Sequence, residues 1–120
     1  MVPDNFVVNN AVVTEFIPFE KISAETFQRC FNATVLSLIL AVQAVLPSIR
    51  RGGRIINIGT LWAHKALPAA LTLYASSKAA AEKVIQDIAF EYGAKLGITI
   101  NNVCPGATET GMGRTRRPKI

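Results

Sequence analysis

Short apolar runs and long apolar segments alternate along this chain, and the alternation predicts strands separated by helices. Three short runs, at residues 6–8, 54–59 and 98–103, are rich in β-branched residues and predict strands. Asn9 and Asn10 follow the first run, and a Pro-Gly pair follows the third. We therefore expect each strand to deliver polar or turn-forming residues to a loop.

The first long segment predicts a helix from about Ala24 to Leu46, which Pro47 ends. Ser23 favours its N-cap, with Thr26 at the position where a capping box usually has glutamate. The second half of this helix is apolar nearly all round, so we expect burial on more than one side. It lies either within the core or between the sheet and a partner subunit, and the periodicity favours neither arrangement.

The second long segment predicts a helix over about residues 72–92, in which alanines permit close packing and Gly93 and Gly97 bracket the exit. Strands that alternate with helices of this length indicate right-handed βαβ units and a parallel sheet. The predicted fold class is α/β: a partial Rossmann-like, doubly wound parallel sheet of order βαβαβ, with about three strands and two long helices. We assign residues 1–113 to this partial domain and residues 114–120 to a basic, irregular tail.

The composition is that of a globular protein, since half of the 120 residues are hydrophobic and 18% are charged. The net charge of +5 derives mainly from the tail, because four of the thirteen basic residues lie in the last seven positions. No basic face is interleaved with aromatic residues, so nucleic-acid binding is not expected.

Two widely separated cysteines, Cys30 and Cys104, favour a reduced, cytoplasmic protein. The N-terminal residues have no signal-peptide pattern. The longest apolar stretch, residues 35–46, is shorter than the roughly 20 residues needed to span a bilayer, so no membrane partner is expected. No metal site is expected either, because the only histidine, His64, has no partner ligands nearby in the sequence.

Candidate chemistry gathers at the carboxyl ends of the predicted strands, where ligands bind in such sheets. Tyr74 and Lys78 open the second helix near this edge, and their spacing of four residues places both side chains on one helix face. An ammonium group beside a phenol favours the phenolate, as a general acid/base for hydride chemistry on an alcohol or ketone requires. Alone, the pair is also typical of a solvated helix surface.

The order of several motifs resembles that of the short-chain dehydrogenase/reductase family. The motifs are VNNA at 8–11, Asn32, GRIINIGT at 53–60, YASSK at 74–78 and NNVCPGATET at 101–110. They cover nearly the whole chain. The chain resembles the catalytic, C-terminal half of the proteins of that family.

The resemblance implies an oxidoreductase that uses NAD or NADP to reduce a ketone or oxidise an alcohol of small size. Tyr74 would give or take the proton of the substrate hydroxyl, and Lys78 would lower its pKa and bind the nicotinamide ribose. Asn32 would hold a water in a proton relay, with its helix locally distorted. Thr60 would polarise the substrate oxygen, where the family usually has serine. The implied cofactor contacts are Asn10, Ala11, Tyr74, Lys78, Pro105, Gly106, Thr108 and Thr110.

Two features separate this chain from the family pattern. Val12 replaces the glycine that usually follows the Asn-Asn-Ala motif, which would hinder close approach of the cofactor. The glycine-rich turn that holds the pyrophosphate is absent from the sequence. The alternative hypothesis is therefore a catalytically incompetent fragment or pseudoenzyme that only self-associates through its apolar helices. The resemblance implies that the same helices form a homodimer or homotetramer.

Overall fold

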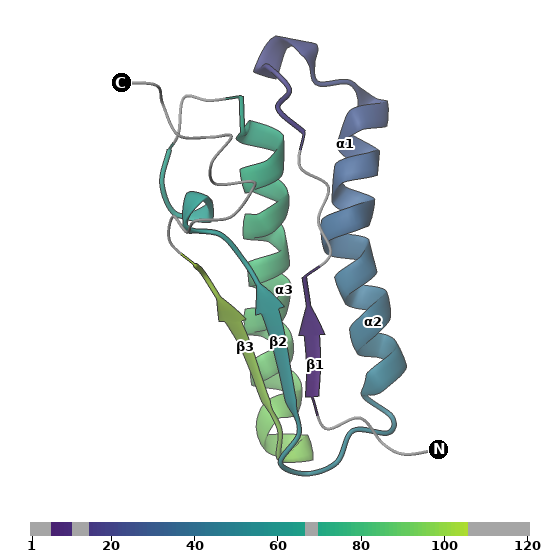
Figure 1. Cartoon of the computed structure of the whole chain (residues 1–120). Coiled ribbons are helices and arrows are strands. Elements are labelled where there is room, and N and C mark those ends of the chain that lie inside the picture. The colour runs from purple at the N-terminus through teal and green to yellow at the C-terminus, as the bar shows by residue number, and fades with distance from the viewer. Residues whose placement is uncertain (1–5, 11–14, 67–69, 106–120) are drawn as a thin grey trace.

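A computed structural model of the chain describes residues 6–10, 15–66 and 70–105. Three parallel strands form one sheet (Figure 1) in the order β1, β2, β3. They are β1 Phe6–Asn9, β2 Arg54–Ile58 and β3 Thr99–Val103. Together with two long helical runs they confirm the α/β, parallel-sheet prediction. The predicted basic tail, residues 114–120, lies outside the described residues.

The first helical run is continuous from Ala24 to Val45, close to the predicted bounds. It consists of α1 Ala24–Phe31, a π-helical segment η2 Asn32–Leu36, and α2 Ser37–Val45. Ser23 is its N-cap, and Thr26 completes a capping box by accepting from the Ser23 backbone N–H at 2.9 Å. A threonine hydroxyl therefore accepts the hydrogen bond from the N-cap backbone that a glutamate carboxylate usually accepts in a capping box.

The second run, α3 Thr72–Leu96, continues four residues beyond the predicted end at residue 92. Gly93 does not stop it, because glycine destabilises a helix only modestly and this segment packs against the sheet. The helix ends at Gly97, whose φ of +67° is the left-handed conformation typical of a C-cap. Two short 3₁₀ turns complete the fold, η1 Phe19–Lys21 and η3 Leu61–Ala63.

Both helical runs cover the same face of the sheet. In Figure 1, α3 passes behind β2 and β3, and α2 runs beside β1. Ile55 and Ile100, which are paired in register, point into a core that α2 and α3 complete. The core residues of the helices are Leu38, Val42, Ala81 and Ile85. Two crossovers of the same hand between successive neighbouring strands require this one-sided arrangement.

The opposite face of the sheet is open within the described residues. Phe6 and Val8 of β1 remain 66% and 59% exposed, and Val103 of β3 is also exposed. Among these residues β1 pairs only with β2, so it is an apolar edge strand.

The helical run Ala24–Val45 is longer than the apolar stretch on which the expectation about membranes rests. It is long and apolar enough to cross a membrane by length and composition, whereas the apolar stretch 35–46 alone is too short. Core helices of proteins outside membranes pass the same test. Here Leu38 and Val42 of this run pack into the core described above.

The end of α3 provides a test of this backbone geometry. Gly97→Ala is expected to destabilise the fold by about 1–2 kcal/mol, because a side chain disfavours the left-handed conformation. A Cβ there would also collide with the Arg51 side chain. Gly93→Ala is the matched control, because its Cβ would lie 3.5 Å from the Ile98 carbonyl oxygen, an ordinary contact. It is expected to stabilise the helix by up to about 1 kcal/mol. Urea unfolding of both variants measures the difference, and shifts in the same direction would contradict it.

Candidate active site

Three asparagine side chains form a hydrogen-bonded ladder across the carboxyl ends of the strands. Asn9, Asn57 and Asn102 occupy paired positions on β1, β2 and β3. The Asn9 amide nitrogen donates to the Asn57 amide oxygen at 2.9 Å, and the Asn57 nitrogen donates to the Asn102 oxygen at 2.7 Å. The Asn102 nitrogen then donates to the Cys104 sulfur at 3.2 Å. The ladder therefore fixes the level at which the three strands end.

Local sequence allows this ladder to form. Asn57 is a polar residue between the apolar residues Ile56 and Ile58, and it is only 1% exposed. Gly59 leaves room for Asn102, because a Cβ at position 59 would lie 2.5 Å from the Asn102 amide nitrogen. Sequence reasoning missed the ladder, but a signal existed: an asparagine within an apolar strand must find a buried partner.

Lys78 is held at the same edge from the helical layer. It is 4% exposed, and its ammonium donates to the carbonyl oxygen of Ile58, the last residue of β2, at 2.8 Å. Burial lowers the pKa of the Lys78 ammonium from its ordinary value, because desolvation penalises the charged form. This contact joins the first turns of α3 to the end of the central strand.

Tyr74 lies one turn before Lys78 on α3 and is 6% exposed. Next to it, the Ser77 hydroxyl donates to the Tyr74 carbonyl oxygen at 2.8 Å. The thiol of Cys30 on α1 lies 3.5 Å from the same Ser77 oxygen. The first turns of α3 are thus packed against the end of α1, so the Tyr74 and Lys78 pair is buried and is not a solvated surface pair.

Thr60 follows β2 and is also buried. It is the N-cap of η3, where its hydroxyl oxygen accepts from the Trp62 backbone N–H at 3.3 Å. Beyond it, a hollow of about 450 Å³ opens between the loop after β2 and the first turns of α3. Its lining includes Trp62, His64, Thr72, Ala75 and Ser76. The hollow lies beside the helix that carries Tyr74.

Asn32 begins the π-helical segment, as expected for a locally distorted helix. Its carbonyl oxygen accepts from the N–H of Ser37, five residues later. Within the segment, the buried Thr34 hydroxyl has no hydrogen-bond partner among the described residues. The Asn32 side chain is exposed and lines a separate groove with Gln28 and Arg29. The side chain of Asn32 therefore does not share the hollow beside Thr60.

The remaining predicted contacts are only partly described. Asn10 and Pro105 are exposed and follow β1 and β3, at the carboxyl edge. Four predicted cofactor contacts lie outside the described residues, as does Val12. They are Ala11, Gly106, Thr108 and Thr110. Within the described part, the edge combines a buried amine, a buried phenol and a hydroxyl donor, which suits proton transfer at an oxygen.

His64 has partners that the sequence could not indicate. Its Nε2 lies 2.9 Å from a carboxylate oxygen of Glu82 on α3. Cys104, after β3, places its sulfur near the same pair. The three residues come from separate segments, so their spacing along the chain gave no signal.

Comparisons with known sequences give a consistent result. A family model described as short chain dehydrogenase matches residues 5–120. A carbonyl reductase (NADPH) 2 of Sus scrofa is 35% identical over 116 residues, which are 94% of this chain and 47% of the relative. A dehydrogenase of Cochliobolus heterostrophus is 33% identical over 108 residues, which are 90% of this chain and 46% of the relative. The chain spans just under half the length of these relatives.

Solved structures extend the likeness to the fold. A short chain dehydrogenase from Burkholderia cenocepacia, in complex with NADP, has a TM-score of 0.84 and 33% identity. The match covers 90% of this chain and 44% of that one. A blue fluorescent protein from a metagenomic library, in complex with NADPH, has a TM-score of 0.85 and 39% identity. That match covers 92% of this chain and 44% of the other.

The ladder predicts that replacing its central residue, Asn57, lowers the stability of the fold. Asn57→Ala removes one donor and one acceptor, so Asn9 and Asn102 each lose a partner. We expect a loss of stability of about 1 kcal/mol for each of the two hydrogen bonds, because Asn9 and Asn102 are only partly buried. Asn101→Ala is the matched control, because Asn101 is exposed on the open face of β3. Equal unfolding free energies for the two variants, measured in urea, would rule out the ladder as a stabilising element.

The burial of Lys78 predicts that the free energy of unfolding depends on pH. Its folded-state pKa is lowered, so between that value and the ordinary 10.5 the unfolded chain binds more protons than the folded chain. The contribution of Lys78 to the free energy of unfolding therefore rises with pH in that window. Lys78→Met is expected to lack this rise, while Lys83→Met, an exposed lysine on the same helix, retains it. Unfolding curves recorded from neutral pH to 10.5 test this, and parallel profiles for wild type and Lys78→Met would contradict it.

Proposed function

This chain belongs to the short chain dehydrogenase family, and we propose that it carries the catalytic half of a nicotinamide-dependent oxidoreductase. The reaction is reduction of a ketone or oxidation of an alcohol, with Tyr74 as the general acid/base. One observation carries the proposal: Tyr74 and Lys78 are buried together at the carboxyl edge of the sheet, where Lys78 contacts the end of β2.

The residues present fit the nicotinamide half of a dinucleotide. An ammonium group has three N–H donors, and among the described residues that of Lys78 has one hydrogen-bond partner, the Ile58 carbonyl. Two donors therefore remain for ribose hydroxyls. Asn10 and Pro105, exposed at the same edge, would contact the cofactor from the ends of β1 and β3. When bound, the reduced cofactor would supply the hydride for reduction of a ketone, and the oxidised cofactor would accept it from an alcohol.

The other steps fall to side chains of this chain. A small carbonyl or alcohol substrate would enter by way of the hollow beside η3, whose lining includes Ala75, the residue after Tyr74, but neither Tyr74 nor Thr60. The Thr60 hydroxyl accepts from the Trp62 backbone, so its own hydrogen can be donated to the substrate oxygen. Tyr74 would give its proton to that oxygen during reduction and take it back during oxidation. The positive charge of Lys78 would stabilise the phenolate formed at Tyr74.

Asn32 is assigned to the proton relay. Its backbone carbonyl accepts the π-helical hydrogen bond, and its exposed amide, which lines the separate groove with Gln28 and Arg29, would hold a water there. Such π-helical distortions are frequent at functional sites. A proton leaving Tyr74 would then pass by way of Lys78 and water to solvent.

The relatives support this class of reaction and cofactor. One is a carbonyl reductase that uses NADPH, and two similar structures contain NADP or NADPH. A cytoplasmic location and homo-oligomers are the family-based extension of the proposal. Exposed apolar side chains on the helices favour self-association, with Leu40 on α2 and Phe90 on α3 among them. The same surfaces also suit the alternative, a chain that associates without catalysis.

Titration of the purified chain with NADH and NADPH, followed by turnover of small ketones, tests the proposal. Saturable cofactor binding is expected, with turnover that Tyr74→Phe lowers by about 10²–10⁴-fold while binding is retained. Tyr92→Phe, at the other tyrosine of α3, is the control and should leave turnover unchanged.

Two results would contradict the proposal, one its catalytic activity and the other the role of Tyr74. A folded chain of defined oligomeric state that binds neither cofactor would favour the non-catalytic alternative. Turnover that is equally reduced in both tyrosine variants would remove Tyr74 as the acid/base.

A further inference from the structure

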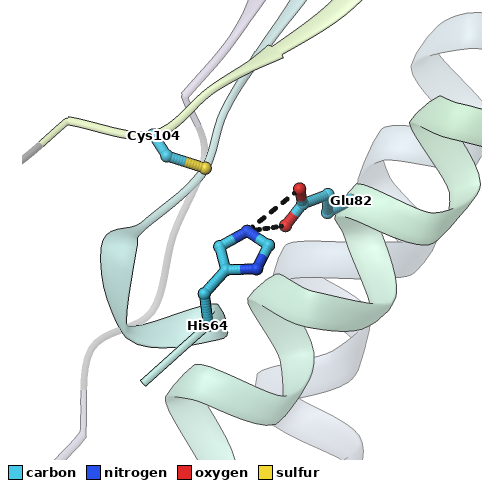
Figure 2. Close-up of side chains that lie close together, drawn as sticks. All are labelled: His64, Glu82 and Cys104. Atoms are coloured by element: carbon cyan, nitrogen blue, oxygen red, sulfur yellow. Dashed lines mark hydrogen bonds and ion pairs between the residues drawn. The ribbon is translucent and has the colours of Figure 1, made fainter.

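We propose that His64, Glu82 and Cys104 form a binding site for a divalent transition-metal ion of the zinc type. Their ligand atoms all lie within 4.8 Å of one another. Figure 2 shows the imidazole and the carboxylate facing each other, with the sulfur directed toward the same space. This site goes beyond the proposed oxidoreductase function and does not depend on it.

Three separate elements build the site. His64 comes from the loop that η3 begins, Glu82 from α3 one turn beyond Lys78, and Cys104 from the residue after β3. Glu82 and Cys104 are fixed by a helix and a strand end, and both are partly buried. The side chain of His64 is 54% exposed, so it can adjust to an ion without disturbing the core.

The donor set matches the ion. Zinc binds imidazole nitrogen, carboxylate oxygen and thiolate sulfur at about 2.0–2.3 Å, and a site with three protein ligands leaves a position for water. Thiolate and carboxylate together carry two negative charges, which balance the charge of the ion. The thiol proton of Cys104 passes to solvent when the sulfur binds, so binding releases a proton.

The geometry needs little rearrangement. His64 Nε2 lies 2.9 Å and 3.1 Å from the two Glu82 oxygens. In a tetrahedral site the bond lengths require ligand atoms about 3.3–3.8 Å apart. The imidazole therefore has to move outward by only a fraction of an ångström to admit an ion between itself and the carboxylate. The sulfur, which lies within 4.8 Å of the other ligand atoms, has to come closer by up to about 1 Å.

The asparagine ladder supports the sulfur ligand. The Asn102 amide donates to the Cys104 sulfur at 3.2 Å, and Asn102 is itself held by Asn57. This hydrogen bond orients the sulfur, as partners of metal ligands commonly do. Cys30, the other cysteine, contacts Ser77 and lies outside the cluster.

The site is tested by titrating the full chain with Co²⁺ and with Zn²⁺. We expect one ion per chain, with a cysteine-to-cobalt charge-transfer band in the near ultraviolet. Cys104→Ser should abolish the band, and Cys30→Ser should retain it. His64→Ala and Glu82→Gln should each weaken Zn²⁺ binding, measured by calorimetry, by at least about tenfold. Changing a residue that only orients a metal ligand already costs about tenfold, and loss of a ligand should cost more.

Asp87→Asn is the control for Glu82→Gln, since Asp87 lies on the exposed side of the same helix in an ion pair with Lys83. It should bind Zn²⁺ like wild type. Far-ultraviolet circular dichroism of each variant establishes that the fold is kept. The proposal is overturned if neither ion binds with saturation, if Cys104→Ser keeps the cobalt band, or if Asp87→Asn weakens binding as much as Glu82→Gln.

Discussion

Side-chain amides tie the three strands together at one level, and the rest of the described edge depends on that level. Asn57 must accept from one neighbour and donate to the other, and an amide can do both whereas a carboxylate cannot. With the strands in this register, the Ile58 carbonyl meets Lys78 and the Cys104 sulfur meets Asn102. A slip of one residue would turn the amides to the open face.

Much of the fold follows from local signals in the sequence. Ser23 and Pro47 bound a helix that the structure confirms nearly to the residue, and apolar runs predict all three strands. The end of α3 was less predictable, since Gly93 and Gly97 are both glycines. Only the backbone conformation, with positive φ at Gly97, distinguishes a terminating glycine from one inside a helix.

The candidate site also has features that the sequence predicts and features that it does not. The pairing of Tyr74 with Lys78 was visible from helical spacing, because residues four apart share a helix face. The partners that act across segments were not visible. The contact of Lys78 with Ile58, and that of His64 with Glu82, join residues whose separation in sequence carries no regular spacing. Such contacts depend on how helices and strands pack, which a single sequence does not encode locally.

The π-helical turn at Asn32 changes the phase of the long helix. In a regular α-helix residues turn by about 100°, so positions four apart drift around the surface by about 40° at each step. Cys30, Thr34, Leu38 and Val42 are spaced by four and are nevertheless all buried. The wider turn absorbs part of this drift and keeps their line facing the core. One residue removed from that turn would therefore act as a rotation, swinging the apolar half of the helix away from the sheet.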